Sequence, residues 1–175
     1  DVYKRQTLGH GFVLDDSLAI ELNKNVTSCV SGIDDILKGG YRENNFGGQL
    51  YRPVSLIQFA IEWQISPNDP AIHHFFSVLW YALSVVLMFL VLRGWFNGYS
   101  ILLPFAIALL FALHPIHTEV VANIKSRDEI MSLFFILASF YTYQKYIIGQ
   151  GKTWVMLSMA LYFLALISKE SAVTM

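Results

Sequence analysis

The chain has 175 residues, of which 55% are hydrophobic and only 14% are charged. Soluble globular domains carry about 25% charged residues, so this composition argues against a soluble domain and predicts an all-α polytopic membrane protein. The formal net charge of −1 leaves no basic footprint, and we expect no nucleic-acid partner. Cys29 is the only cysteine, which excludes an internal disulfide.

Residues 1–16 are predicted to hold the truncated end of a first membrane span. The stretch "GFVLDD" at 11–16 is typical of an apolar helix that runs into two acids, Asp15 and Asp16. The chain begins with Asp1 and stops in "LISKESAVTM", where a new polar motif begins. We therefore expect an internal fragment of a longer protein, with the C-terminal remainder absent.

Residues 17–72 are predicted to form a long extracytoplasmic loop that carries interfacial helices. Its Gly- and Asn-rich stretch "KGGYRENNFGG" is typical of loop, and one short amphipathic piece at 31–37 precedes it. A second begins at Pro53, a residue suited to a helix start. This helix is too short and too charged to span a membrane, so we expect it on the membrane surface. Its apolar side chains share one face at helical spacing: Leu56, Phe59, Ala60 and Trp63.

Residues 73–175 are predicted to hold four transmembrane spans, at about 75–92, 101–113, 130–148 and 154–167, with a polar connection at 114–129. The short turns "RGWFNGYS" and "GQGKT" carry basic residues and no acids, which places them in the cytoplasm. Every other polar segment then emerges on the opposite face. The expected arrangement is an integral, multi-pass protein in a lipid bilayer, with its ionisable clusters at one membrane boundary.

Asp15 and Asp16 are the first chemistry-bearing group. Adjacent carboxylates raise each other's pKa, so one of them could act as a general base near neutral pH. Alternatively the pair could hold a divalent cation. A solvated helix end is the bland explanation, and the pair alone does not decide among the three.

The connection "HPIHTEVVANIKSRDE" is richer in ionisable groups. If a helix runs from 116 to 129, Glu119, Asn123 and Arg127 lie at i, i+4 and i+8 and form a polar stripe, as a helix lining a wet cleft requires. Arg127 or Lys125 could bind a phosphate there. The alternative is an interfacial helix with internal salt bridges.

His114 and His117 invite a zinc interpretation, but their spacing is not His-Glu-x-x-His. A third ligand would have to be Glu119 or a loop aspartate, and we favour an orienting, hydrogen-bonded role. We therefore predict no metal site and no required cofactor, with a divalent cation left as the alternative.

Three further polar motifs lie near predicted span ends. "YRP" places Tyr51 and Arg52 before the helix that starts at Pro53, "HH" places His74 at the start of a span, and "SKES" places Lys169 and Glu170 at the end of the last span. Their alternatives are lipid-headgroup contact, an interface feature and snorkelling, respectively.

Four phrases occur together in one order: "FVLDDSLAIELNKNV", "YRPVSLIQFAIEW", "ALLFALHPIHTEVVANIKSRDEI" and "LALISKESAV". Together they resemble the transmembrane and tetratricopeptide-repeat O-mannosyltransferase family, of the bacterial type, within the C-type glycosyltransferase superfamily. The resemblance runs from about residue 12 to 175. One departure is visible, because relatives often carry His-x-x-Asn-x-x-x-His where this chain has His74, Ser77 and Tyr81.

The resemblance implies a C-type helical bundle whose active site faces the periplasm of a bacterial inner membrane, or the lumen if the membrane is that of the endoplasmic reticulum. The donor would be a polyprenyl- or dolichyl-phosphate-linked sugar, and the acceptor a protein hydroxyl or a glycan. Asp15 or Asp16 would be the catalytic base, and Arg52, Lys125, Arg127 and Lys169 would hold the donor phosphate. The supporting residues would be Tyr51, His74, His114, His117, Glu119, Asn123, Asp128, Glu129 and Glu170.

Two other functions remain alternatives, a transporter or channel subunit and a non-catalytic membrane scaffold. Transporters more often carry polar residues or broken helices near mid-membrane, in repeated halves. Here the spans are nearly free of charge and the ionisable residues gather at one boundary, which favours the enzyme.

Overall fold

The computed structural model describes residues 11–12, 14–39 and 51–174, apart from the side chains of Leu14 and Asp15. Every element in this part of the chain is a helix, which confirms the predicted all-α class. The elements in chain order are α2 (Leu14–Ala19), α3 (Lys24–Thr27), η2 (Cys29–Gly32), α4 (Ile33–Lys38), α5 (Pro53–Ile65), α6 (Pro70–Trp95), α7 (Leu102–Leu113), α8 (His117–Ala122), α9 (Arg127–Ile147), α10 (Thr153–Ser168) and η3 (Glu170–Thr174).

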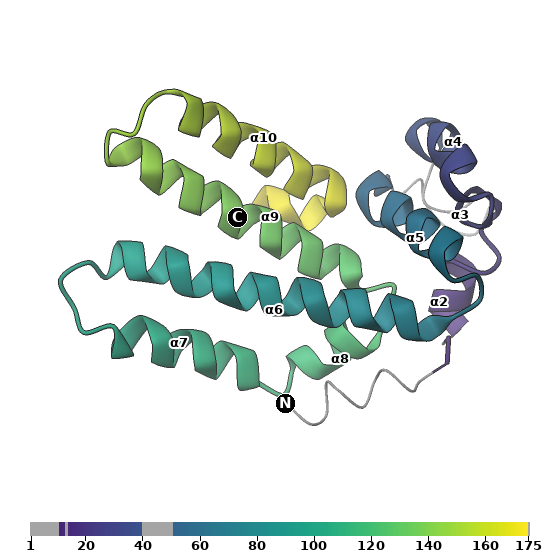
Figure 1. Ribbon diagram of the computed structural model, residues 1–175, viewed down its shortest axis with the longest axis horizontal. Helices are drawn as coiled ribbons and strands as arrows, with labels where there is room; N and C mark the ends of the chain where they lie inside the picture. The colour runs from purple at the N-terminus through teal and green to yellow at the C-terminus, as the bar shows by residue number, and fades with distance from the viewer. Residues whose placement is uncertain (1–10, 13, 40–50, 175) are drawn as a thin grey trace.

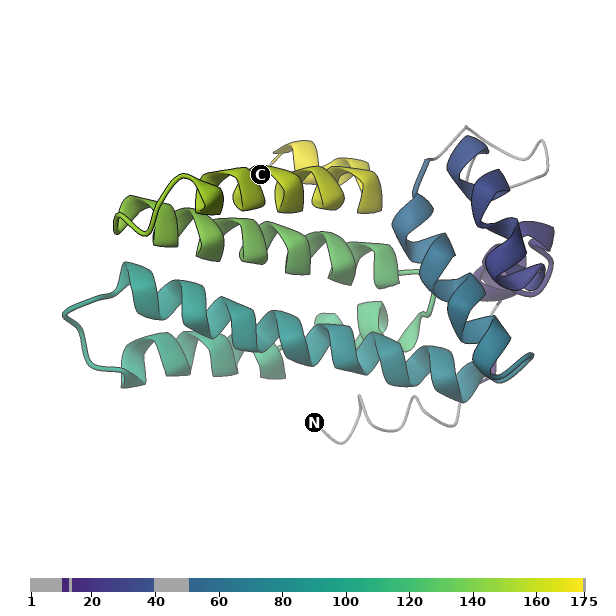
Figure 2. The ribbon, with the colours of Figure 1, turned by 45° about the horizontal axis from the view of Figure 1, so that its top comes forward.

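Four long helices form the body of the molecule. Helices α6, α7, α9 and α10 run side by side along the long axis, and α6 packs on both α7 and α9 (Figure 1). The short helices α2 to α5, together with α8, gather at one end of this bundle (Figures 1 and 2). The two short turns lie at the other end, so the polar segments share one end of the bundle.

The long helices occupy the places of the four predicted spans. Among the described residues, one helix, α6, is long and apolar enough to cross a membrane, and α7 and α10 are shorter apolar helices. Only 22% of the most apolar window of α6 is buried inside the protein, whereas a core helix of a soluble protein would be mostly buried. Large apolar side chains are also exposed on α7 and α10, such as Leu110 and Met156. The crossing of a bilayer by all four helices stays a prediction.

Local sequence explains where α5 and α6 begin. Each starts at a proline, Pro53 or Pro70, whose missing N–H is not needed in a first turn. Asp69 caps α6, because its side chain accepts a hydrogen bond from the Ala71 N–H at 3.0 Å. This cap makes α6 begin five residues before the predicted start of the span at 75.

The two short turns that we predicted to lie in the cytoplasm depend on glycine. Gly98, Gly149 and Gly151 have φ values of 105°, 86° and 104°, which favour a residue without a Cβ. Near the same end, Gly94 lets α6 approach α9 closely, since a Cβ there would lie 2.5 Å from the Gln144 side-chain oxygen. Gln144 donates to the Val91 carbonyl at 2.9 Å and joins the two helices.

The amphipathic helix expected at Pro53 is present, but its apolar face has a different partner from the one predicted. Leu56, Phe59 and Ala60 are buried in a cluster that includes Ile20 of the α2 end and Val26 of α3. We expected this face to contact the membrane surface, and the structure corrects that expectation: the face packs within the protein. The physical reason is that α2 to α4 supply an apolar surface that local periodicity does not reveal.

The first predicted element is also different. Gly11 and Phe12 lie outside any helix, and α2 starts at Leu14, so Asp15 and Asp16 lie inside a short helix. The prediction of an apolar helix that ends at these acids is therefore wrong for residues 11–16, and residues 1–10 lie outside the described part of the chain.

Two serine hydroxyl groups join α9 to α10, and we predict that their hydrogen bonds stabilise this contact. Ser139 donates to the Ser158 carbonyl at 3.0 Å, and Ser158 donates to the Ser139 carbonyl at 2.9 Å. Such pairs between apolar helices contribute about 0.6 kcal/mol. A double-mutant cycle with Ser139→Ala and Ser158→Ala, measured by chemical unfolding in detergent micelles, should show a coupling energy of this size. Strictly additive effects would contradict it.

Candidate functional site

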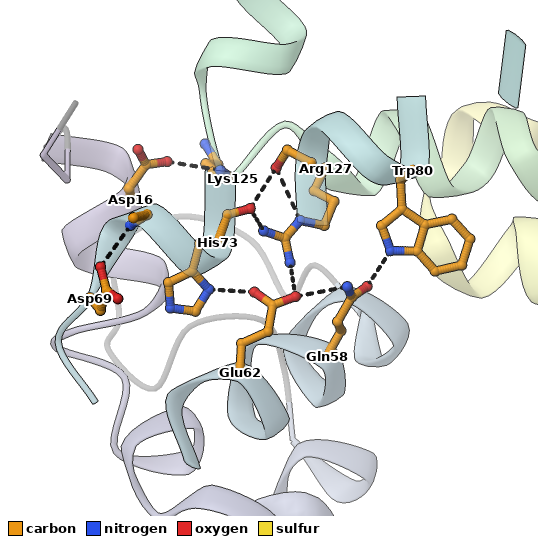
Figure 3. Close-up of polar contacts among 10 residues, drawn as sticks. Asp16, Gln58, Glu62, Asp69, His73, Trp80, Lys125 and Arg127 are labelled. Carbon is orange, nitrogen blue, oxygen red and sulfur yellow. Dashed lines mark hydrogen bonds and ion pairs between the residues drawn. The ribbon is translucent and has the colours of Figure 1, made fainter. Parts of the chain in front are cut away.

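The first residue of α9, Arg127, joins three helices through a fully buried side chain. Its guanidinium donates to a Glu62 carboxylate oxygen on α5 at 2.5 Å and to the Ser77 hydroxyl on α6 at 3.2 Å (Figure 3). It also donates to the His73 carbonyl on α6 and lies 4.6 Å over the ring of Phe59. The polar ends of α5, α6 and α9 are thus fastened at one charged group.

Glu62 is the buried counter-charge, with 1% of its surface exposed. One carboxylate oxygen accepts from Arg127 and also from the Gln58 amide at 2.7 Å, and the other lies 2.5 Å from His73 Nδ1. Gln58 in turn accepts from the Trp80 indole N–H at 2.8 Å. A buried carboxylate is costly unless it is paired and hydrogen-bonded, and both oxygens of Glu62 are.

Arg52 forms a second ionic group, beside the first. Positioned as the N-cap residue of α5, it pairs with buried Asp128 and binds the Glu170 carboxylate with two N–H groups, at 2.6 and 3.0 Å. Burial by itself would lower the pKa of the guanidinium, but the bonds and charges of Glu170 and Asp128 outweigh it and raise that pKa. Arg52 is therefore firmly cationic, and the side chain of Glu170 is 58% exposed.

A third ionic contact lies at the same end. Lys169 pairs with Glu129, whose side chain is 47% exposed. Lys169 precedes Glu170 in the chain and Glu129 follows Asp128, so the two neighbouring pairs bring the start of η3 against the first turn of α9. The structure thus brings together five predicted site residues: Arg52, Asp128, Glu129, Lys169 and Glu170.

Asp16 is fully buried and accepts the backbone N–H of Lys125 at 2.8 Å (Figure 3). The same N–H also lies 3.1 Å from the Asn123 side-chain oxygen. These bonds join α2 to the segment between α8 and α9. Asp15 lies in the same helix, but its side chain is outside the described part of the structure.

The connection between α8 and α9 corrects the prediction of one continuous helix from 116 to 129. Helix α8 ends at Ala122, Asn123 takes an extended conformation, and α9 begins at Arg127. The break leaves the Lys125 N–H for Asp16 and turns Arg127 inward to Glu62. Glu119 is exposed on α8, so the predicted stripe of Glu119, Asn123 and Arg127 does not form.

The histidines fall in two places. His114 and His117 belong to an aromatic group with Phe111 and Tyr81, and the His117 and Phe111 ring centroids lie 4.3 Å apart. His74 is fully buried in α6. Throughout residues 11–12, 14–39 and 51–174, no group of three His, Cys, Asp or Glu side chains is placed to hold a metal ion.

The pairs formed by Arg52, Asp128, Glu129, Lys169 and Glu170 are called the ionic cluster. An apolar cavity of about 280 Å³ adjoins this cluster. Tyr81, Phe111, Val120, Ile130 and Ile136 line it, together with residues of η3. Glu129 also lines this cavity while it pairs with Lys169, so a cation contacts a residue of the cavity wall. Tyr51 lies apart from the cavity lining, and its hydroxyl donates to the Leu37 carbonyl at 3.0 Å.

Sequence reasoning missed Glu62 and Gln58, and it interpreted His73 of the "HH" motif as an interface feature, whereas His73 contacts Glu62. A signal for Glu62 was present: it follows Phe59 by three residues and therefore shares the apolar face of α5. An acid on a face that packs into a core requires a buried partner. That partner, Arg127, lies 65 residues away in the chain, beyond the reach of any local pattern.

The described sequence has relatives among curated proteins. It is 30% identical over 173 residues to the mouse protein O-mannosyl-transferase TMTC3, a match that covers 94% of this chain and 18% of that protein. It is 32% identical over 186 residues to human TMTC4, covering 93% and 25%, and 29% identical over 182 residues to Drosophila melanogaster Tmtc1, covering 96% and 20%. The chain thus spans about a fifth to a quarter of the length of these relatives. No family model matches it, and no solved structure matches it either.

We predict a pH dependence for the Arg52–Glu170 pair. The hydrogen bond from Arg52 lowers the pKa of the Glu170 carboxyl below its ordinary value, so the unfolded chain binds this proton more readily. The stability from the pair is present above about pH 4.3 and is lost as the pH falls through the folded-state pKa. The Tm difference between the wild type and Glu170→Gln should therefore shrink between pH 7 and about pH 3. A constant difference would contradict this.

Proposed function

The chain is a relative of the transmembrane and tetratricopeptide-repeat O-mannosyltransferases, as the four motifs predicted, and on that premise we propose that it forms part of a membrane glycosyltransferase. The enzyme transfers a sugar, mannose or another hexose, from a polyprenyl- or dolichyl-phosphate donor to a protein hydroxyl or glycan acceptor at the extracytoplasmic face. The observation that carries this proposal is the ionic cluster beside an apolar cavity: Arg52 and Lys169 each hold an exposed carboxylate there.

Arg52 is the main phosphate ligand in this proposal. It binds Glu170 with two parallel N–H groups, and a phosphate offers a similar pair of oxygens. Because Glu170 is exposed, a phosphate can replace it while Asp128 continues to hold the guanidinium from the buried side. Lys169 pairs with Glu129 of the cavity wall and would bind the same phosphate.

The other two predicted phosphate ligands differ in position. Lys125 lies in the segment that contacts Asp16, and we keep it as a phosphate ligand. Arg127 is fully buried on Glu62 and Ser77. Its burial supports a positioning role in place of the predicted phosphate contact.

Asp16 or Asp15 acts as the general base. It takes the proton from the acceptor hydroxyl, whose oxygen forms a bond to the anomeric carbon as the bond from that carbon to the lipid phosphate breaks, with inversion. The lipid phosphate leaves with the electron pair, and Arg52 and Lys169 stabilise its charge. For Asp16, the Lys125 N–H fixes the orientation of the carboxylate. Positioning and charge stabilisation supply most of the catalysis.

The apolar cavity receives the first isoprene units of the donor. Its walls come from α6 to α9 and η3, and it lies next to the pair of Lys169 and Glu129. A ligand with an anionic head and an apolar chain matches that combination.

The distribution of charge supports an enzyme over a transporter. Within the described helices α6, α7, α9 and α10, the Asp, Glu, Lys and Arg side chains lie in the first or last turns: Arg93, Arg127, Asp128, Glu129 and Lys145. A transport pathway more often places such residues near mid-membrane. A sugar-transfer assay distinguishes an enzyme from a non-catalytic scaffold.

We predict that one of the variants Asp15→Asn and Asp16→Asn lowers kcat by about 10²–10⁴-fold, as loss of a general base does. The assay measures transfer from dolichyl-phosphate mannose to an acceptor protein by the whole protein that contains this chain. Asp34→Asn on α4, an exposed acid, is the matched control and should retain full activity. Undiminished transfer in both aspartate variants would refute the base, and no transfer by the wild type would refute the proposed function.

We predict that Val120→Trp raises KM for the long-chain donor about tenfold, because a larger side chain in the cavity displaces about two buried methylene groups at about 0.8 kcal/mol each. Val30→Trp, at a valine of η2 that is 51% exposed, controls for the added indole. Equal KM values for the two variants in the same assay would show that the isoprenoid chain of the donor binds elsewhere.

A further inference from the structure

A second apolar hollow, a groove, lies between α6 and α9 in the half of α6 that leads to the first short turn. Its volume is about 240 Å³, and a cavity of about 150 Å³ is large enough to hold a benzene ring. The groove therefore has room for a segment of an aliphatic chain. Six of its lining side chains form two stripes, one on each helix: Leu83, Val86 and Leu90 on α6, and Phe134, Ala138 and Tyr141 on α9.

Both stripes end in a cation. Arg93 follows Leu90 by three residues on α6. On α9, Lys145 follows Tyr141 by four residues and Ala138 by seven. Residues at these spacings lie on one face of a helix. In addition, Lys145 Nζ lies 5.2 Å from the centroid of the Tyr141 ring, which places this cation against the wall of the groove.

The two helices are held together at the level of these cations. Gln144, the residue before Lys145, donates to the Val91 carbonyl at 2.9 Å. Gly94, the residue after Arg93, lies close to Gln144, since a Cβ there would be 2.5 Å from the side-chain oxygen. Arg93 and Lys145 therefore lie at the same end of the groove, next to the short turns that appear on the left in Figure 2.

The short turns and the helix ends beside them carry positive charge and no carboxylate. Residues 93–100 and 143–153 contain Arg93, Lys145 and Lys152 but no Asp or Glu. No ion pair among the described residues involves Arg93 or Lys145. Basic pockets between membrane helices are a recurring site for anionic lipid headgroups, and this pocket continues into an apolar groove.

We infer that the groove binds an anionic phospholipid of the bilayer, with one acyl chain between α6 and α9 and the phosphate on Arg93 and Lys145. Helix α6, which forms one wall, is long and apolar enough to cross a membrane. Its Leu83 and Val86 are 42% and 56% exposed, so the groove opens on the apolar surface of the bundle. The ionic cluster lies at the opposite end, and this site does not depend on the proposed sugar transfer.

Two lipids with the same acyl chains test the headgroup contact. Dioleoyl phosphatidylglycerol or dioleoyl phosphatidylcholine is titrated into the whole protein in detergent micelles, and bound lipid is counted by native mass spectrometry. The wild type should bind the anionic lipid at least about fivefold more tightly than the zwitterionic lipid. Arg93→Gln and Lys145→Gln should each weaken binding of the anionic lipid about fivefold, which is about 1 kcal/mol. Lys152→Gln, at an exposed lysine outside both stripes, is the matched control and should bind as the wild type does.

A substitution that fills the groove tests the acyl-chain contact. Ala138→Phe places a ring where the chain lies and should weaken binding of both lipids about tenfold, which is about 1.4 kcal/mol. The ratio of the two affinities should stay unchanged, because both cations remain. Ala160→Phe, at an exposed alanine of α10, controls for the added ring and should bind as the wild type does.

Each contact has a result that overturns the inference. Equal affinity of the wild type for the two lipids, or no bound lipid, removes the recognition of charge. Wild-type affinity in both Arg93→Gln and Lys145→Gln places the headgroup elsewhere, for example at the ionic cluster. Wild-type affinity in Ala138→Phe leaves the groove to another occupant, such as a helix from the rest of the protein. If Ala138→Phe does not fold, the two cation variants decide the inference.

Discussion

The buried pair of Arg127 and Glu62 is the interaction on which the polar end of this molecule depends. Arg127 contacts α5 and α6 from the first position of α9, and residues close to it in the chain contact other elements. The Lys125 amide meets Asp16, and Asp128 meets Arg52. Seating one guanidinium therefore places the proposed base and the proposed phosphate ligand. The pair costs desolvation, and this cost is met only while both partners remain.

Charge at this end is divided by depth, and the division has a functional meaning. Glu62, Asp128 and Arg127 are buried with their partners and cannot exchange them for a ligand without opening the fold. Glu170 and Glu129 are exposed carboxylates on cations, and in the proposed function a phosphate replaces them. Among these five residues, the buried ones fix geometry and the exposed ones can exchange partners, while the proposed base, Asp16, is itself buried.

Much of the helical architecture could be read from local sequence. Apolar runs and their breaks located α6, α7, α9 and α10 to within a few residues, and Pro53 marked the start of α5. The errors have one cause. The segment at 116–129 has good helical periodicity, yet it breaks at Asn123 because Asp16 and Glu62 bind Lys125 and Arg127 from distant elements. Similarly, the apolar face of α5 packs against α2 to α4, whereas we expected it to contact the membrane surface.

The sequence by itself determined the helical class, the separation of charged from apolar segments and the resemblance to the O-mannosyltransferases, because these depend on composition, spacing and motif order. Tertiary structure decided which ionisable residues share a site and which are buried. Arg52 and Arg127 look equivalent in sequence, but Arg52 pairs with an exposed carboxylate as well as a buried one, whereas Arg127 lies fully buried against Glu62. That difference arises from burial and from partners far away in the chain, and the strength of a charge–charge interaction depends on both.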